Sequence, residues 1–342
     1  MSSLAFVLCG ESHPGLLGSY GRALRSLGWR TTHYDHDAGL RRHVRLGKLG
    51  ELLSGHLGVE SWNRKANRDL YLSITEASPD VFVFAGPQLV RPGLLAQLRV
   101  SLPRCKIVCY WPDTLLNLEA HSLQLFALCD LVLSYSREAS PVLERAGARR
   151  VLFSPFAADL ELFPELPESN AAERQRWSSD VMFAANHRPE REDAVLRLLD
   201  AGMRVRVWGS SDWSRYSRHP ERVRDYFEGG ILAGSDMTRA MRGAHACLNL
   251  IDPTNYPAAN MRFFEIYASG GCALSSRCPE MESEFVDGQH VSYFEADTLV
   301  ERALALCNDA ALRRRVSEQG RAKALSAHTY VHRVSEWLGA LD

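Results

Sequence analysis

Residues 257–275 combine the residue types needed to bind an anion and a sugar. Glu265 lies about one helical turn beyond Arg262, and Gly270-Gly271 indicates the end of that helix before an apolar strand. Pro257-Ala-Ala can open the helix, so that its free N–H groups would face an anion. Arginine and amide donors for phosphate, with a carboxylate for sugar hydroxyls, indicate a nucleotide-sugar site. An amphipathic helix with an i,i+3 Arg–Glu pair on its solvent side explains this stretch equally well.

For three other polar groups, a structural role explains the residues better than metal or ligand binding does. Residues 33–37 include two histidines and two aspartates, but neighbours on an extended chain point to opposite faces, which favours a strand-end turn. His328 and His332 are four residues apart but lack the glutamate of a zinc helix, which favours packing or capping. The basic runs 40–49 and 64–68 favour solvated helix faces, with peripheral contact to an anionic lipid or acceptor as the alternative.

The N-terminal half alternates apolar and helical segments. Leu4–Cys9 is an apolar run that ends at a glycine-rich turn, and a helical pattern follows over 20–27. Further strands are expected at 30–34, 81–85, 106–111 and 131–134, with helices at 62–77, 94–102 and 118–129. This alternation predicts a parallel sheet covered on both faces, with ligands at the carboxyl ends of its strands.

A second alternating series follows a polar, proline-marked segment. Its strands are expected at 180–185, 204–208, 246–250, 272–274 and 291–294. We therefore predict an α/β protein with two doubly wound, Rossmann-like domains. The expected bounds are 1–165 for the first domain, 166–178 for the linker and 179–326 for the second domain, with a C-terminal helix at 327–342.

Composition limits the class of protein. The chain has 342 residues, of which 46% are hydrophobic and 24% charged, as in a globular protein of about two domains. Forty Lys and Arg against 41 Asp and Glu give a net charge of -1, so no nucleic-acid partner is expected. The first apolar run is too short for a signal peptide or spanning helix, which predicts a cytoplasmic protein. Eight cysteines without a Cys-x-x-Cys pair are expected to be reduced and buried.

The order of several motifs resembles that of a known family. These motifs are Asp180-Val-Met-Phe-Ala-Ala, Val205-Arg-Val-Trp-Gly209, Tyr226-Phe-Glu-Gly-Gly230, Cys247-Leu-Asn-Leu250, residues 260–275, Phe285-Val-Asp-Gly288, Gly320 and His328–Arg333. Together they resemble the CgeB-like family of GT-B glycosyltransferases, related to the group 1 transferases, most densely over 178–340. Ser78-Pro-Asp80 and Tyr110–Thr114 extend the likeness more loosely into the first half.

The resemblance implies an architecture and a ligand. It implies two Rossmann-like domains with an interdomain cleft, a nucleotide diphosphate-sugar held mainly by the second domain, and a C-terminal helix that crosses back to the first. Glu265 matches the second glutamate of the group 1 Glu-x7-Glu motif, which is expected on the ribose hydroxyls. Pro257 stands where the first glutamate would be, so Asn260 and the amides around it are expected to serve the sugar.

The resemblance also supplies candidates for the diphosphate and the base. Arg191 and Arg188 match the basic residues that follow the first strand of the second domain and neutralise the diphosphate. Ala184 or Ala185 replaces the glycine usual there, which disfavours close approach of the backbone to phosphate. Three further residues complete the expected nucleotide site: Gly209, Gly230 and Ile231, the last two in the loop that generally reads the base.

Departure of a nucleoside diphosphate requires stabilisation of negative charge. Arg191, Arg262 and the helix N-terminus can supply it electrostatically, so we predict no cofactor and no metal requirement. On the acceptor side, His13 follows the first strand and Asp113 follows the fourth. Either can orient or deprotonate a hydroxyl, and histidine as a residue type has the more suitable pKa. The structural alternatives are a solvent-facing turn for His13 and a helix cap for Asp113.

These observations predict a glycosyltransferase of the hexosyl or a related type that acts on a nucleotide diphosphate-sugar, with a UDP-sugar favoured. The group 1 likeness favours retention of configuration. An epimerase or hydrolase of the same fold is the enzymatic alternative. The missing first glutamate and Ala184-Ala185 motivate a non-catalytic binding or assembly protein as the other alternative. The acceptor and the oligomeric state stay open.

Overall fold

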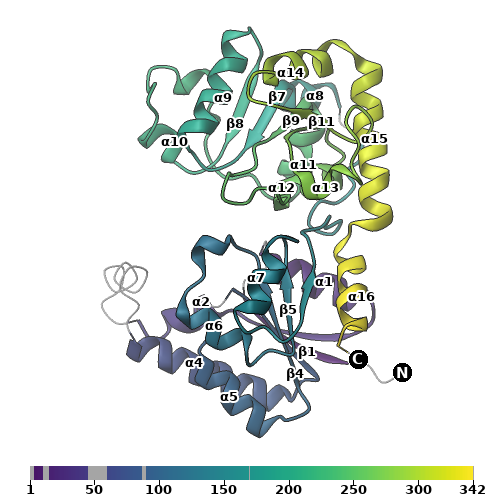
Figure 1. The fold of residues 1–342 in the computed structure, drawn as a ribbon. Coiled ribbons are helices and arrows are strands. Elements are labelled where there is room, and N and C mark those ends of the chain that lie inside the picture. The colour runs from purple at the N-terminus through teal and green to yellow at the C-terminus, as the bar shows by residue number, and fades with distance from the viewer. Residues whose placement is uncertain (1–3, 11–14, 45–59, 87–89, 169, 342) are drawn as a thin grey trace. The chain divides into compact units, whose positions relative to one another are not determined.

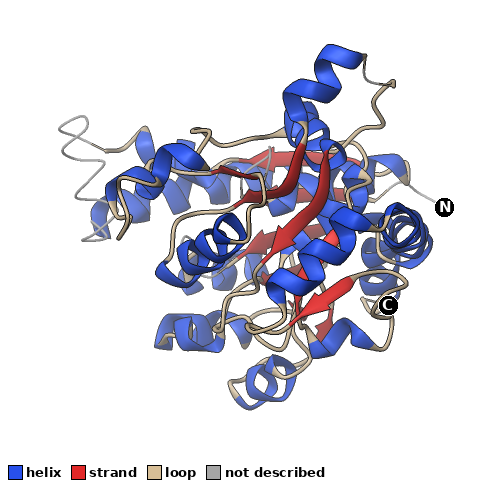
Figure 2. Cartoon of the chain, turned by 90° about the horizontal axis from the view of Figure 1, so that it is seen from above, coloured by secondary structure: helices blue, strands red, loops and turns tan. Residues whose placement is uncertain are grey.

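The computed structural model describes residues 4–10, 15–44, 60–86, 90–168 and 170–341. The chain divides into two compact units: unit 1 consists of Met1–Pro155 with Tyr330–Asp342, and unit 2 consists of Phe156–Thr329 (Figure 1). Each unit contains a parallel sheet with helices along its faces (Figure 2). The predicted α/β class with two doubly wound units is therefore confirmed. Among the described residues, no helix has the length and apolar character to cross a membrane.

The described part of unit 1 has a six-stranded parallel sheet in the order β2-β1-β3-β4-β5-β6. Its strands are β1 (Ala5–Cys9), β2 (Arg30–Tyr34), β3 (Val81–Ala85), β4 (Lys106–Trp111), β5 (Leu131–Ser134) and β6 (Val151–Phe153). Its helices are α1 (Leu16–Ser26), α2 (His36–Arg41), α4 (Glu60–Ala77), α5 (Pro92–Ser101), α6 (Ala120–Phe126), α7 (Ala139–Arg145) and α16 (Tyr330–Gly339). The chain starts inside the sheet and proceeds to both sides, as a doubly wound fold does.

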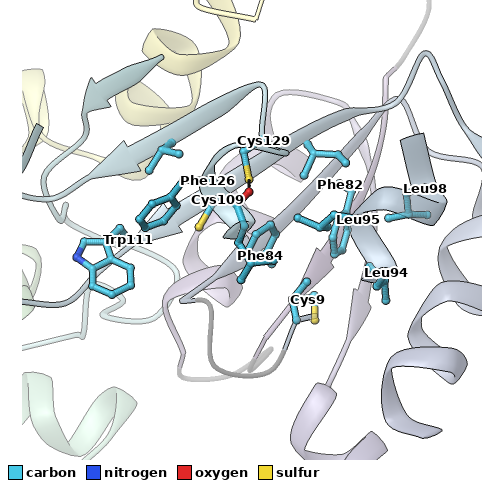
Figure 3. Packing of buried hydrophobic residues seen from close by; sticks show 14 of the residues in the cluster. Cys9, Phe82, Phe84, Leu94, Leu95, Leu98, Cys109, Trp111, Phe126 and Cys129 are labelled. Carbon is cyan, nitrogen blue, oxygen red and sulfur yellow. Dashed lines mark hydrogen bonds between the residues drawn. The ribbon is translucent and has the colours of Figure 1, made fainter. Parts of the chain in front are cut away.

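The central strands β1, β3, β4 and β5 are largely apolar and buried, because helices cover both faces of the sheet, whereas the edge strand β2 is polar and partly exposed. In β3, Phe82 and Phe84 are fully buried on one face, and Val81 and Val83 are buried on the other. Figure 3 shows the two phenylalanines packed with side chains of β4 and with leucines of α5. Each large apolar side chain buried in this way contributes about 1.5–3 kcal/mol.

Helix α16 packs against α1 within unit 1. The rings of Tyr330 and Trp337 lie 5.1 Å and 6.4 Å from the ring of Tyr20, and Trp337 also contacts Phe6. Arg333 is buried and donates from Nε to the carbonyl oxygen of Pro155 at 3.0 Å. The last turns of the chain therefore complete the core of the unit that begins it.

The described part of unit 2 has a five-stranded parallel sheet in the order β11-β10-β9-β7-β8. Its strands are β7 (Ser179–Ala184), β8 (Val205–Trp208), β9 (Ala244–Asn249), β10 (Ala273–Ser276) and β11 (Ser292–Phe294). Its helices are α8 (Ala171–Trp177), α9 (Pro189–Asp200), α10 (Asp212–Arg215), α11 (Gly234–Gly243), α12 (Met261–Ser269), α13 (Pro279–Glu282), α14 (Leu299–Asn308) and α15 (Ala310–Ala327).

The compact units divide the chain at other residues than the bounds expected from sequence. Residues 156–165 pack with unit 2, where Leu162 and Phe163 are buried. The segment expected as a linker contains α8, because Asn170 caps this helix and Trp177 is buried near the ring of Trp208. At the C-terminal end, the chain belongs to unit 1 again from Tyr330 onward, whereas the expected boundary was at residue 327.

The structural roles expected for residues 33–37 and His328, and the burial expected for most cysteines, are confirmed. Asp35 caps α2 by accepting from the amide of Ala38, as a strand-end turn requires. His328 is buried, stacks on Phe264 and lies 2.9 Å from a carboxylate oxygen of Glu284. All eight cysteines are free and seven are buried, whereas Cys307 is partly exposed.

Candidate functional site

The order of strands in unit 2 determines where a ligand would bind. Strand β7 is the first strand of this unit and lies between β8 and β9. The connection after β7 leads to β8 on one side, and the connection after β9 leads to β10 on the other side, so the strand order reverses between β7 and β9. In open parallel sheets, ligands bind at the carboxyl ends of the strands at such a switch point. The loops after β7 and after β9, residues 185–188 and 250–260, meet at this edge.

Two arginines and an aspartate connect these loops. Arg188 at the N-terminus of α9 pairs with Asp252 after β9, with 2.9 Å between Nη2 and Oδ2. Asp252 is 93% buried and also accepts from the amide and hydroxyl of Thr254. Arg191, in the first turn of α9, donates to the carbonyl oxygen of Asn186 at 3.0 Å. The structure thus places Arg188 and Arg191 near each other and adds Asp252 to them.

The charge of Arg191 is only partly compensated. Burial lowers the pKa of this guanidinium, and the positive charge of Arg188 lowers it further, although Asp252 and Glu190 oppose both effects. For Asp252, burial alone would raise the carboxyl pKa, but the hydrogen bonds from Thr254 and the two arginines lower it. The cluster therefore holds a fixed carboxylate and two cations in a half-buried place, which favours a bound anion.

The start of α12 is held by asparagine side chains. Asn260 is the N-cap and accepts from the amide of Phe263 at 3.1 Å, and its own amide donates to Asn249 at the end of β9. Asn249 in turn donates to Ser275 of β10. Among the described residues, no acceptor is recorded for the amides of Met261 and Arg262, so the first turn of α12 keeps free donors.

The expectation that Pro257-Ala-Ala opens this helix is wrong. The helix begins at Met261, because the side chain of Asn260 can cap it, whereas alanine at positions 258 and 259 cannot. Its predicted end is confirmed: Gly270 is the C-cap in the left-handed conformation, with φ of 78°. The free amides therefore lie at Met261 and Arg262, next to Asn260.

Arg262 and Glu265 form the ion pair that the spacing indicated. Nη1 of Arg262 lies 2.5 Å from Oε2 of Glu265, and the two side chains are 25% and 15% exposed. The pair is thus mostly buried, not on a solvated face. Arg262 also approaches the sulfur of Met237 in α11 at 3.6 Å. Its recorded partners are therefore different from those of Arg188 and Arg191.

Gly209 and Gly230 lie side by side after β8. The amide of Gly209 donates to the carbonyl oxygen of Gly230 at 2.8 Å. A Cβ at Gly209 would lie 2.1 Å from the carbonyl oxygen of Ala185, which also accepts from the indole of Trp213 at 2.7 Å. Gly230 has φ of 68°, and Ile231 beside it is 76% exposed. The loop at Gly230 and Ile231 is therefore exposed.

Sequence reasoning missed the buried carboxylate of Glu192 in α9. It accepts hydrogen bonds from the hydroxyl of Ser217 and the amide of Arg218, and it contacts His187 at 3.2 Å. Burial would raise the pKa of Glu192, but these hydrogen bonds outweigh burial and lower it to about 2. Glu192 thus connects α9 to the loop after α10. The sequence does carry a sign of this buried carboxylate, because Glu192 occupies a position of the helical pattern where an apolar residue is expected.

In unit 1, Asp113 lines a cavity of about 410 Å³ at the carboxyl ends of β3 and β4. Its two carboxylate oxygens accept from the amide of Thr114 and the side chain of Asn117, each at 2.7 Å. The helix cap considered for Asp113 is not Asp113 itself, because the neighbouring Thr114 is the N-cap of the short helix over Leu115–Asn117. His121 lines the same cavity and was not singled out from sequence. The other candidate, His13, lies outside the described residues.

The basic run at 64–68 lies on α4. Arg64, Lys65 and Arg68 line a groove of about 760 Å³ between α4 and α5, together with Tyr71 and Leu72. The neighbouring run 40–49 lies partly outside the described residues. Contact of these cations with an anionic lipid or acceptor stays a prediction.

Two Rossmann-like units in one chain, the second with an arginine cluster at its switch point, form the arrangement called GT-B. Residues 188–339 match the model of a family described as glycosyl transferase-like. No curated protein sequence matches the chain.

Solved structures agree with this class over nearly the whole chain. Sucrose-phosphate synthase from Thermosynechococcus elongatus is similar with a TM-score of 0.68 and 12% identity, covering 99% of each chain. A glycosyltransferase from Rickettsia africae has a TM-score of 0.69 and 10% identity, covering 100% of this chain and 98% of its own. HepE of Anabaena, solved with UDP, has a TM-score of 0.63 and 12% identity, covering 98% and 100%. The predicted GT-B fold is confirmed, and the family match supports a glycosyltransferase.

Proposed function

We propose that this chain is a CgeB-like glycosyltransferase that moves a sugar from a nucleotide diphosphate-sugar to an acceptor hydroxyl. The observation that carries the proposal is the place of Arg188 and Arg191 at the switch point of the unit 2 sheet, where Arg188 pairs with the buried Asp252 and Arg191 with the carbonyl oxygen of Asn186. A diphosphate bound there would supply the missing negative charge and bidentate acceptors for both arginines. The family match over 188–339 covers this cluster and α12.

In the proposed complex, α12 holds the nucleoside end of the donor. Arg262 and the free amides at the start of the helix join the two arginines at the diphosphate. Glu265 accepts from the ribose hydroxyls, and Asn260 serves the sugar in place of the missing first glutamate. The loop at Gly230 and Ile231 contacts the base, which we propose to be uracil. Because Arg262 pairs with Glu265 in the free protein, donor binding divides this ion pair between phosphate and ribose.

Transfer breaks the bond between the anomeric carbon and the terminal phosphate oxygen and forms a bond from that carbon to the acceptor oxygen. The negative charge passes to the departing nucleoside diphosphate, where the arginines stabilise it without a metal. The acceptor hydroxyl loses its proton, and Asp113 is the proposed group that orients or accepts from it, with His13 as the other candidate. The group 1 likeness supports retention.

A thermal-shift panel tests the donor site. UDP and UDP-sugars are expected to raise the melting temperature more than GDP, ADP and their sugars, because a ligand that binds the folded state stabilises it in proportion to RT ln(1 + [L]/Kd). Free monosaccharides are expected to have no effect, since they carry no phosphate. A flat panel at millimolar ligand would exclude the donor site.

Two substitutions in α12 separate the phosphate end from the nucleoside end. Glu265→Ala is expected to weaken uridine and UDP by the same factor, because it acts on the ribose. Arg262→Ala is expected to weaken UDP much more than uridine, because it acts on the phosphates. Isothermal titration of both ligands against both variants gives the ratio. If the loss of UDP affinity relative to uridine affinity were the same in both variants, the proposed position of the phosphates would be wrong.

Product analysis distinguishes transfer from the other activities of this fold. With UDP-sugar and a panel of hydroxyl compounds, a transferase gives a glycosylated product, whereas an epimerase alters the donor without an acceptor. A hydrolase releases UDP at a rate that no hydroxyl compound changes, and a binding protein releases nothing. Asp113→Asn is expected to keep donor binding and lower transfer. Glu119→Gln, at another carboxylate lining the same cavity, is the matched control.

A further inference from the structure

Three side chains with metal-binding atoms meet at the amino edge of the unit 2 sheet. Asp180 is the second residue of β7, His245 is the second residue of β9, and Cys307 lies in the last turn of α14. A carboxylate oxygen of Asp180, a ring nitrogen of His245 and the sulfur of Cys307 all lie within 4.8 Å of one another. Within the described ranges, no other group of three such residues is this close.

The sheet register holds the first two residues side by side. Ser179 pairs with Ala244 and Val181 with Ala246, so Asp180 and His245 occupy matching positions on neighbouring parallel strands and point to the same face. Asp180 is fixed further, because its Oδ2 accepts from the amide of Arg204 at 2.9 Å. Its Oδ1 is directed to His245. Such a pair on rigid strands needs little ordering to bind an ion.

The spacing of the two side chains suits a tetrahedral ion. Nδ1 of His245 lies 3.3 Å from Oδ1 of Asp180. In a tetrahedral zinc site, nitrogen and oxygen ligands at about 2.0–2.1 Å from the metal stand ~3.3–3.4 Å apart. Nδ1 is shielded from solvent yet forms no hydrogen bond with the described residues. The sulfur of Cys307 lies within 4.8 Å of both atoms and would have to move closer to complete a Zn–S bond of about 2.3 Å.

We propose that Asp180, His245 and Cys307 form a binding site for a zinc-type divalent cation, with water in the fourth position. A thiolate, an imidazole and a carboxylate together suit Zn²⁺ and disfavour Mg²⁺ and Ca²⁺, which prefer oxygen ligands alone. On binding, the Cys307 thiol releases its proton to solvent, and the thiolate and carboxylate balance the two charges of the metal.

The site is separate from the donor site. It lies where β7 and β9 begin, whereas Arg188, Asp252 and Asn260 lie beyond the carboxyl ends of the same two strands. The metal therefore takes no part in transfer and joins two strands to α14. The side chains of Asp180 and His245 are 35% and 43% exposed, so solvent reaches the pair although Nδ1 itself is covered. Arg313 nearby is engaged with the carbonyl oxygens of Leu306 and Cys307, and the Cys307 thiol donates a long hydrogen bond of 3.8 Å to the carbonyl oxygen of Asp180, which metal binding would replace.

Cobalt titration of the full, tag-free chain tests the proposal. One equivalent of Co²⁺ is expected to give tetrahedral d–d bands and a thiolate-to-metal charge-transfer band, and Zn²⁺ is expected to displace it. Cys307→Ser is expected to abolish the charge-transfer band, and His245→Gln to weaken Co²⁺ binding at least tenfold. Asp180→Asn, whose amide oxygen can still accept from Arg204, is expected to weaken binding without loss of folding.

His219→Gln is the matched control. His219 is a half-exposed histidine of the same unit that lies 3.7 Å from Glu221 without a cysteine in the pair, so its loss is expected to change nothing. The absence of a charge-transfer band in the wild type would overturn the proposal. Equal titrations of the wild type and the His245→Gln variant would overturn it too, since they would indicate nonspecific surface binding. Circular dichroism of each variant verifies that it is folded.

Discussion

At the scale of single residues, the guanidinium of Arg191 is a candidate to bind an anion. It is half-buried beside Arg188, and burial and this like charge both lower its pKa. We expect Arg191→Ala to weaken UDP binding roughly ten- to a hundredfold, because a hydrogen bond between charged partners contributes about 1.5–3 kcal/mol. Isothermal titration at low and at high salt measures the loss and its electrostatic share.

Arg197→Ala is the control for that substitution. Arg197 lies on the same helix, α9, but is exposed in its last turn. Its replacement removes the same charge from the same element and is expected to leave UDP binding unchanged. Comparable losses in both variants would mean that the net charge of unit 2, and not the cluster, attracts the nucleotide.

The sequence could indicate the two arginines of the candidate site but not the two buried carboxylates near them. Arg188 and Arg191 were candidates because they match the basic residues that follow the first strand of the second domain in the family that the sequence resembles, and in the structure they come after the carboxyl end of β7. Asp252 was missed because its partner, Arg188, lies on another loop, and only the pairing of β7 with β9 brings the two together. Glu192 was missed for the same reason, since Ser217 and Arg218 approach it from a distant loop.

At the scale of elements, Glu192 fastens α9 to the loop after α10 through a pH-dependent contact. Its folded pKa of about 2 is below the ordinary value of 4.5, so its stabilisation is complete above pH 4.5 and is lost as the pH falls toward 2. This difference corresponds to about 3 kcal/mol for a side chain with no solvent exposure. Urea unfolding of the wild type at several pH values is expected to show this loss.

The Glu192→Gln variant isolates that contribution. It keeps the shape and a hydrogen-bonding group but cannot ionise, so its unfolding free energy is expected to fall less between pH 4.5 and 2. Parallel losses in variant and wild type over this range would assign the acid sensitivity to other carboxylates, such as Glu284.

Gly209 controls how closely β8 and the loop after β7 approach each other. We expect Gly209→Ala to lower the unfolding free energy by about 1–3 kcal/mol, because the added methyl group would meet the backbone oxygen of Ala185. Gly93→Ala is the control, since nothing lies within 4 Å of a Cβ at Gly93. Denaturant unfolding measures both. Equal stability of the two variants would show that the loop yields without cost.

Strands were predicted more accurately than helices. The bounds of β3, β4 and β5 match the expected ranges residue for residue, because nearly all side chains of these strands are apolar and buried. Helix α8 was expected as a linker, since Trp177 is its one buried residue and its other side chains are polar. The start of α12 was misplaced because a proline signal was preferred over the asparagine cap at position 260.

At the scale of the whole molecule, the two compact units should respond separately to core substitutions. Trp337 of α16 is fully buried in unit 1 against Phe6 and Tyr20. We expect Trp337→Ala to destabilise unit 1 by about 3–5 kcal/mol. Hydrogen exchange is expected to show loss of protection in β1 and α1 and retained protection in β7 and β9.

Trp213→Ala provides the reciprocal test. Trp213 is fully buried in the core of unit 2, so its loss is expected to reduce protection in β7 and β8 and to spare β1 and α1. If either substitution lowered protection equally throughout the chain, the two units would unfold as one cooperative body.

Because α16 belongs to unit 1, the unit whose synthesis begins first is the last to have all its residues. Unit 2 is one continuous segment and has all its residues as soon as Thr329 has been added. Unit 1 must wait for Trp337, so during translation the surface of Phe6 and Tyr20 stays uncovered while the whole of unit 2 is made. A nascent chain stalled before residue 330 would therefore present an apolar surface that chaperones recognise, although most of its sequence has already left the ribosome.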